Sequence, residues 1–163
     1  MAAGAPDAVT NVGFSVGVGL VLLVAGAAKL RQPEWPATAR AFGLPRWASA
    51  LLPWAEVAVG AMLVTGVGMP FTALAAAALV AGFTGMVALR LVLGQPAPCG
   101  CFGETSPRPI GTATLVRNLI LLGAAAGAVL TAGEGGGPVA AAAGVAGAAV
   151  FLLLGRSRAA APH

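Results

Sequence analysis

The chain has little charge for its 163 residues, because Asp, Glu, Lys and Arg together make up only 9% of it. A soluble domain carries about 25% charged residues, which cover the surface that faces water. Hydrophobic residues make up 58% of this chain. The composition therefore excludes an ordinary soluble domain and favours an all-α integral membrane protein, whose surface faces lipid.

Metal ligands are also scarce. The sequence has two cysteines, Cys99 and Cys101, and one histidine, His163, in a segment (156–163) that we expect to be a flexible tail. A zinc site needs about four ligands, and an iron–sulfur cluster is held by about four thiolates. This chain alone therefore cannot build a metal centre of either kind.

No basic face is present either, which argues against binding to nucleic acid. The nine Lys and Arg residues are scattered, mostly at the ends of apolar runs, where cationic side chains meet lipid headgroups. The first apolar run has only Asp7 before it and no basic region. It is therefore predicted as a membrane span and not as a cleaved signal peptide.

Four apolar runs have the length of about 20 residues that a helix needs to cross a bilayer. A fifth, shorter and Ala-rich run follows them, and we expect it to cross as well. The sequence thus predicts a four-transmembrane-helix bundle plus a fifth C-terminal helix, in a single membrane domain of residues 1–155. The predicted spans are 10–28, 48–67, 71–93, 112–132 and 139–154.

Two longer connectors are expected on one side of the membrane, because the short turns between the other spans make neighbouring helices antiparallel. The connector 29–47 contains a predicted interfacial helix, Pro36–Phe42. The loop 94–111 has four prolines and no helical pattern. This loop holds both cysteines.

Cys99-Gly100-Cys101 favours redox chemistry, because structural cysteines usually sit in apolar segments and these lie in a Pro- and Gly-rich loop. A disulfide between them would close a very small, strained ring, although Gly100 relieves part of the strain. Strain makes a disulfide easier to reduce. The spacing predicts a labile, exchanging bond, and the alternative is a pair of inert thiols.

Charged residues inside the predicted spans converge on the cysteine side. Glu56 lies roughly 12 Å and Arg117 roughly 8 Å into their helices, at 1.5 Å per residue. Such charges are costly in lipid and need partners. One interpretation is a polar pocket of Glu56, Arg117, Lys29 and Asn118 that tunes the thiolates or transfers protons. The alternatives are a structural Glu56–Arg117 ion pair, an interhelical hydrogen bond from Asn118, and snorkelling by Lys29 and Arg90.

Four motifs in residues 12–132 resemble the MauE family of membrane proteins, which is related to the DoxX-like proteins. The most specific is the cysteine motif, in which Gly100, Phe102 and Gly103 would shape the loop. The motifs are Gly26-Ala-Ala-Lys29, Leu52-Pro53-Trp-Ala-Glu56 with Gly60, Cys99-Gly-Cys-Phe-Gly103 and Arg117-Asn118.

The resemblance implies a four-helix core in the bacterial cytoplasmic (inner) membrane and thiol–disulfide chemistry outside the cytoplasm. MauE is associated with maturation of the disulfide-rich small subunit of methylamine dehydrogenase, so the expected partner is a thioredoxin-like protein or a cysteine-bearing client. The architecture also resembles quinone-linked enzymes of the vitamin K epoxide reductase type. A membrane quinone is thus a candidate electron carrier, but those enzymes use two cysteine pairs and this chain has one.

The positive-inside rule points the other way on sidedness. Lys and Arg residues flank both connectors on the cysteine side, and the turns 66–70 and 133–138 have none. That asymmetry indicates that the cysteines lie on the cytoplasmic side, which is reducing. The resemblance favours the extracytoplasmic side, and we expect the cysteines to lie there. Besides a thiol–disulfide oxidoreductase, two other classes stay open: a non-catalytic scaffold or chaperone, and a small transporter that uses Glu56 and Arg117.

Overall fold

The computed structural model describes residues 5–94, 111–130, 145–146, 148–150 and 152, with the backbone alone for residues 5–12. Four long helices dominate this part of the chain, and each is long and apolar enough to cross a membrane. They are α1 (Ala5–Arg31), α3 (Arg46–Thr65), α4 (Phe71–Val92) and α5 (Thr112–Leu130). The protein is an all-α, multi-pass membrane bundle.

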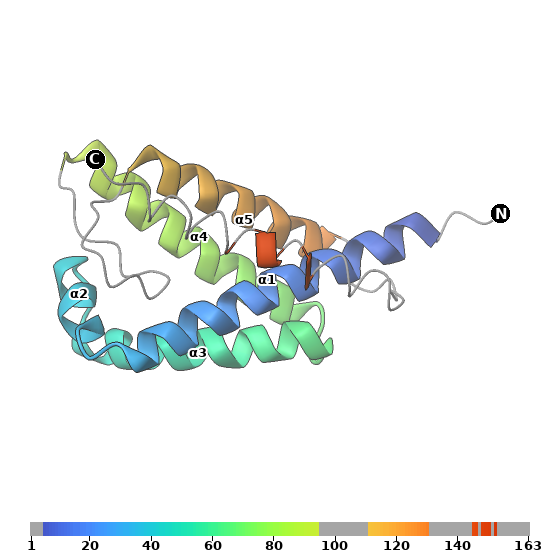
Figure 1. Cartoon of the computed structure of the whole chain (residues 1–163), viewed down its shortest axis with the longest axis horizontal. Coiled ribbons are helices and arrows are strands. Elements are labelled where there is room, and N and C mark those ends of the chain that lie inside the picture. Colours follow the sequence, from blue (N-terminus) through green and yellow to red (C-terminus); the bar gives the residue numbers. More distant parts are fainter. Residues whose placement is uncertain (1–4, 95–110, 131–144, 147, 151, 153–163) are drawn as a thin grey trace.

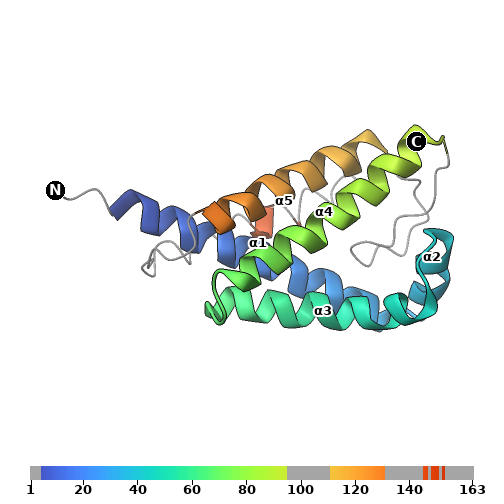
Figure 2. The same cartoon turned by 180° about the vertical axis from the view of Figure 1, so that it is seen from behind.

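The four helices form two antiparallel pairs that lie on one another (Figure 1). Helix α1 packs along α3, and α4 packs along α5, with α1 also in contact with α5. The view from behind shows the same two layers (Figure 2). A small core of Val, Leu and Ala side chains fills the space between the layers, including Val18, Val21, Val80 and Leu121.

The four predicted long spans are confirmed. Helix α1 extends beyond the predicted span 10–28 at both ends, and the other three helices end within two residues of their predicted bounds. Most of the predicted fifth span, 139–154, lies outside the described residues, and so does the tail 156–163. The residues described in that span are helical, and Ala148 is buried in the core. A fifth crossing stays a prediction.

Glycines allow α1 and α3 to touch backbone to backbone. A Cβ atom at Gly60 would lie 2.7 Å from the carbonyl oxygen of Gly19, and one at Gly26 would lie 2.7 Å from the carbonyl oxygen of Pro53. Both distances are shorter than any real Cβ contact. Since lipid offers no hydrophobic driving force between helices, small residues that permit such close contact are a main source of helix association in membranes.

A short helix, α2 (Trp35–Ala41), closes one end of the bundle. It begins one residue earlier than the predicted interfacial helix and has a proline in its first turn, where a missing N–H costs nothing. Arg90, at the end of α4, donates a hydrogen bond of 2.5 Å to the carbonyl oxygen of Ala41 and lies over the ring of Phe42. The side chain of Arg90 thus fastens α2 to α4, which differs from the snorkelling anchor considered for it.

Candidate functional site: an ion pair inside the bundle

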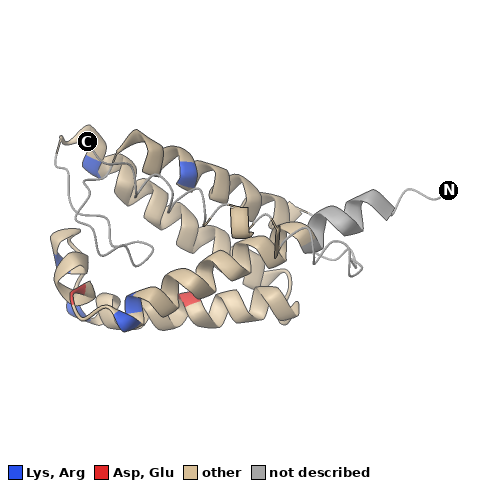
Figure 3. Cartoon of the chain, in the orientation of Figure 1, with Lys and Arg blue, Asp and Glu red and all other residues tan. Residues whose placement is uncertain are grey.

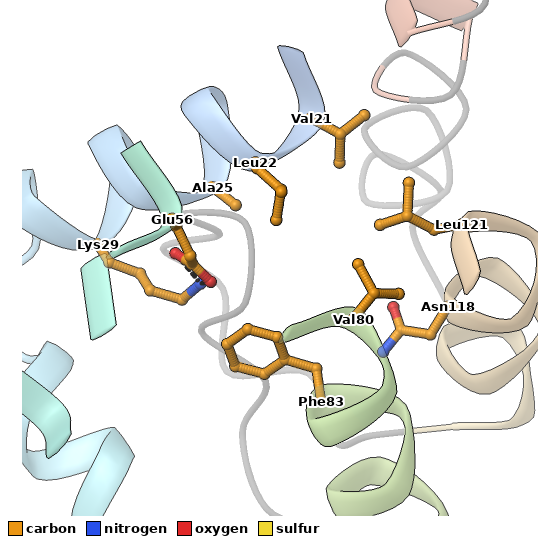
Figure 4. Close-up of a pocket in the computed structure, with 9 residues that line it drawn as sticks. All are labelled: Val21, Leu22, Ala25, Lys29, Glu56, Val80, Phe83, Asn118 and Leu121. Carbon is orange, nitrogen blue, oxygen red and sulfur yellow. Dashed lines mark hydrogen bonds and ion pairs between the residues drawn. The ribbon is translucent and has the colours of Figure 1, made fainter. Parts of the chain in front are cut away.

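A lysine from α1 and a glutamate from α3 form a buried ion pair (Figure 4). The Nζ atom of Lys29 donates to both carboxylate oxygens of Glu56, at 2.5 Å and 2.7 Å. The exposed fraction is 2% for Lys29 and 1% for Glu56. Both charges are therefore withdrawn from lipid and from bulk water, and each neutralises the other.

The close approach of α1 and α3 brings the two charges together. Gly26, one turn before Lys29, lies against Pro53 and Glu56 of α3, and a Cβ atom there would be 3.1 Å from the Cβ of Glu56. A larger residue at position 26 would push the helices apart at the level of the pair. The motifs Gly26-Ala-Ala-Lys29 and Pro53-Trp-Ala-Glu56 are thus two halves of one helix contact.

Two aromatic rings cover the ammonium group. The Nζ atom of Lys29 lies 4.7 Å from the ring centre of Phe83 on α4 and 5.2 Å from that of Trp35 on α2. Cation–π attraction within about 6 Å is worth about 2 kcal/mol when the partners are desolvated. The carboxylate and both rings therefore surround the ammonium group, and the ion pair with its two rings connects α1, α2, α3 and α4.

The position of Trp35 depends on a proline in α3. In a regular helix the carbonyl oxygen of Ser49 would accept a hydrogen bond from the N–H of residue 53, but Pro53 has no N–H. The indole Nε1 of Trp35 donates to this oxygen instead, at 2.7 Å. Because Trp35 is only 7% exposed, Pro53 in effect creates a buried acceptor that holds the tryptophan over Lys29.

Replacing Trp35 by Phe is expected to lower the free energy of unfolding by about 1–3 kcal/mol, because it leaves the carbonyl oxygen of Ser49 buried without a donor. Unfolding in detergent, followed by circular dichroism, measures the change. Trp54→Phe is the matched control, since Trp54 is 62% exposed on the lipid-facing side of α3 and should change stability by less than about 0.5 kcal/mol. Equal stabilities of the two variants would refute this role for Trp35.

A small cavity lies beside the ion pair and is lined by residues of α1, α3, α4 and α5 (Figure 4). Its volume is about 30 Å³, and Asn118 of α5 lines it across from Lys29 and Glu56. For comparison, an engineered cavity that binds benzene, a single small ring, has a volume of about 150 Å³. A quinone ring therefore does not fit in this cavity.

A family model described as Methylamine utilisation protein MauE matches residues 7–131. The chain belongs to the MauE family. No curated protein and no solved structure matches the chain. The matched range includes the ion pair, both covering rings and the cavity, so this polar site lies within the MauE part of the chain.

In this MauE protein the partner of Glu56 is Lys29, whereas the sequence suggested Arg117 as an ion-pair partner. Arg117 is half-buried on α5 and is not among the described residues that line the cavity. Asn118, its neighbour in the chain, does line the cavity and is 5% exposed. Lys29 is too deeply buried to be a snorkelling anchor. The structure thus brings Lys29, Glu56 and Asn118 together, and it adds Trp35 and Phe83, which the sequence analysis did not identify.

The two cysteines of this MauE protein lie outside the described residues, together with Gly100, Phe102 and Gly103. Their placement relative to the ion pair stays a prediction. The residues that flank their segment belong to the end of α4 and the start of α5. Both of these lie at the end of the bundle that carries α2, where Lys and Arg residues gather (Figure 3).

Proposed function

We propose that this protein is a membrane thiol–disulfide redox protein whose Cys99 and Cys101 exchange disulfides with a thioredoxin-like partner or a cysteine-bearing client during protein maturation. Membership of the MauE family supports the proposal. The observation that carries it is the Cys-Gly-Cys motif, inserted in the connection between α4 and α5. This connection begins and ends at the polar end of the bundle.

The exchange needs no cofactor. A thiolate of one protein attacks the disulfide of the other and forms a mixed disulfide, with the displaced sulfur leaving as a thiolate. The second cysteine then attacks the mixed disulfide and releases the partner. Two electrons and two protons pass from the dithiol that is oxidised to the disulfide that is reduced. A labile bond between Cys99 and Cys101 suits this cycle.

The ion pair has a supporting part in this proposal. Lys29 and Glu56 join α1 to α3, and the rings over Lys29 come from α2 and α4. The pair therefore holds α1, α2, α3 and α4 together, and α4 is one of the two helices that flank the cysteine-bearing segment. A bundle end fixed in this way gives a docking partner a constant surface.

Trapping of the mixed disulfide tests the proposal. Cys99→Ser and Cys101→Ser each leave one thiol that cannot resolve an adduct, so at least one variant should accumulate a disulfide-linked complex after acid quenching and non-reducing electrophoresis. The double variant is the control and should form none. Absence of any adduct in both single variants would reject the exchange mechanism, and activity that survives the double substitution would favour a scaffold.

We further propose that the protein lies in the bacterial cytoplasmic membrane with its cysteines on the extracytoplasmic side. Lys29 and Arg90 count toward a cytoplasmic assignment, but both make contacts within the protein: Lys29 is in the buried ion pair, and Arg90 donates a hydrogen bond to the end of α2. Their charge therefore has a structural cause, which weakens the charge argument. A membrane-impermeant maleimide should label the reduced cysteines of intact cells; labelling only after lysis would place them in the cytoplasm.

A further inference from the structure

Asn118 is a polar side chain without a partner in the part of the chain that the structure describes. It sits on the membrane-spanning helix α5, is 5% exposed, and points into the cavity beside the ion pair (Figure 4). A buried amide that lacks hydrogen bonds costs about 1–3 kcal/mol. Its presence inside an apolar helix bundle therefore calls for a ligand in the cavity that it faces.

The ion pair presents further hydrogen-bonding capacity to the same cavity. The ammonium group of Lys29 has three N–H donors, and Glu56 accepts two of them. The carboxylate of Glu56 has about four acceptor sites, of which Lys29 occupies two. Donors and acceptors thus stand on one wall of the cavity, and an amide that both donates and accepts stands on another.

The size of the cavity selects the ligand. A water molecule needs about 10–15 Å³ of such space and two to four polar partners. The cavity has about 30 Å³, which is enough for roughly two water molecules. The rest of its wall is apolar: Val21, Leu22, Ala25, Val80, Phe83 and Leu121.

We propose that this cavity is a water-binding site in which one or two ordered molecules link the amide of Asn118 to the Lys29–Glu56 pair. Water donates to the free acceptor sites of Glu56, accepts from Lys29 or from the amide nitrogen of Asn118, and donates to the amide oxygen. Every polar group at the cavity is then satisfied. Charged residues inside membrane proteins commonly face such water. Through it, the ion pair exchanges protons with water although it lies within the bundle.

The sequence contains a single lysine, Lys29, which makes the site directly observable. Protein labelled with ¹⁵N-lysine, in lipid nanodiscs, gives one ammonium signal by solid-state NMR, and polarisation transferred from water protons to this signal measures its hydration. Strong transfer is expected in the parent chain. Asn118→Leu, which keeps the size of the side chain and removes its polarity, should lose most of this transfer, while Asn118→Ser should retain it.

Two further variants complete the test. Leu121→Phe fills the cavity without changing a polar group and should also lose the transfer, which covers the case in which Asn118→Leu does not fold. Ile120→Leu lies on the lipid-facing side of α5, with 62% exposed, and should behave as the parent does. Transfer that is absent in the parent, or unchanged in both Asn118→Leu and Leu121→Phe, would overturn the proposal. The measurement does not involve the cysteines, so it is independent of the redox function.

Discussion

Replacing Glu56 by Gln is expected to destabilise the folded bundle by about 3–5 kcal/mol, the range found when one member of a buried ion pair is removed. The substitution leaves the ammonium group of Lys29 2% exposed and without its counter-charge. The rings of Phe83 and Trp35 offset only part of that cost. Reversible unfolding in detergent micelles, followed by helical circular dichroism, measures the loss.

A double-mutant cycle separates the interaction energy between Lys29 and Glu56 from the effect of replacing either residue alone. Lys29→Met combined with Glu56→Gln removes both charges, so the double variant should be more stable than either single variant. Glu34→Gln is the matched control, because Glu34 is exposed before α2 and should change stability by less than about 0.5 kcal/mol. A single Glu56→Gln variant as stable as the control would show that the pair contributes nothing to the fold.

The sequence predicted the membrane spans well and the partner of Glu56 badly, for one physical reason. Apolar run length locates a span, and rise per residue gives the depth of a charge in its helix. Depth alone does not say which face of a helix a residue occupies or which helix lies next to it. By depth, Arg117 and Lys29 both lie toward the cysteine side of the membrane, as Glu56 does, so depth makes either of them a possible partner. The packing of α1 along α3 places Lys29, and not Arg117, next to Glu56.

The packing of α1 on α3 did leave a signal in the sequence. Gly26 comes three residues before Lys29, and Pro53 comes three residues before Glu56. Equal spacing places Gly26 and Pro53 each one turn from the charged residue of its own helix, on the same side of that helix. The role of Trp35 was harder to predict, because it depends on a three-dimensional meeting between α2 and the carbonyl oxygen that Pro53 leaves unpaired.

Gly60→Ala is expected to destabilise the bundle by about 1–3 kcal/mol, the usual cost of overpacking a filled interior. The added Cβ atom would lie 2.7 Å from the carbonyl oxygen of Gly19 and 2.9 Å from the backbone nitrogen of Leu23. Both atoms belong to the backbone of α1, so no side chain can rotate to make room. Relief requires the whole helix to move away from α3.

The same change elsewhere in the chain controls for helix propensity. Gly82, on α4, has no atom within 4 Å of an added Cβ, so Gly82→Ala should be neutral or stabilising by up to about 1 kcal/mol. The comparison uses one chemical substitution in two transmembrane helices. If Gly60→Ala and Gly82→Ala have the same free energy of unfolding, the close contact between α1 and α3 does not contribute to stability.

The contact of Gly60 with α1 and the Lys29–Glu56 ion pair should also be energetically coupled. Gly60 lies one turn beyond Glu56 on α3, so moving α1 outward at Gly60 also lengthens the distance from Lys29 to Glu56. In the Lys29→Met, Glu56→Gln background no ion pair remains to be stretched. Gly60→Ala should therefore cost less there than in the parent chain, with an interaction energy in the range of about 0.5–3 kcal/mol seen for residues that share a backbone shift. If Gly60→Ala costs the same free energy in both backgrounds, the glycine contact and the ion pair stabilise the bundle independently. The shift of α1 at Gly60 then does not reach Lys29.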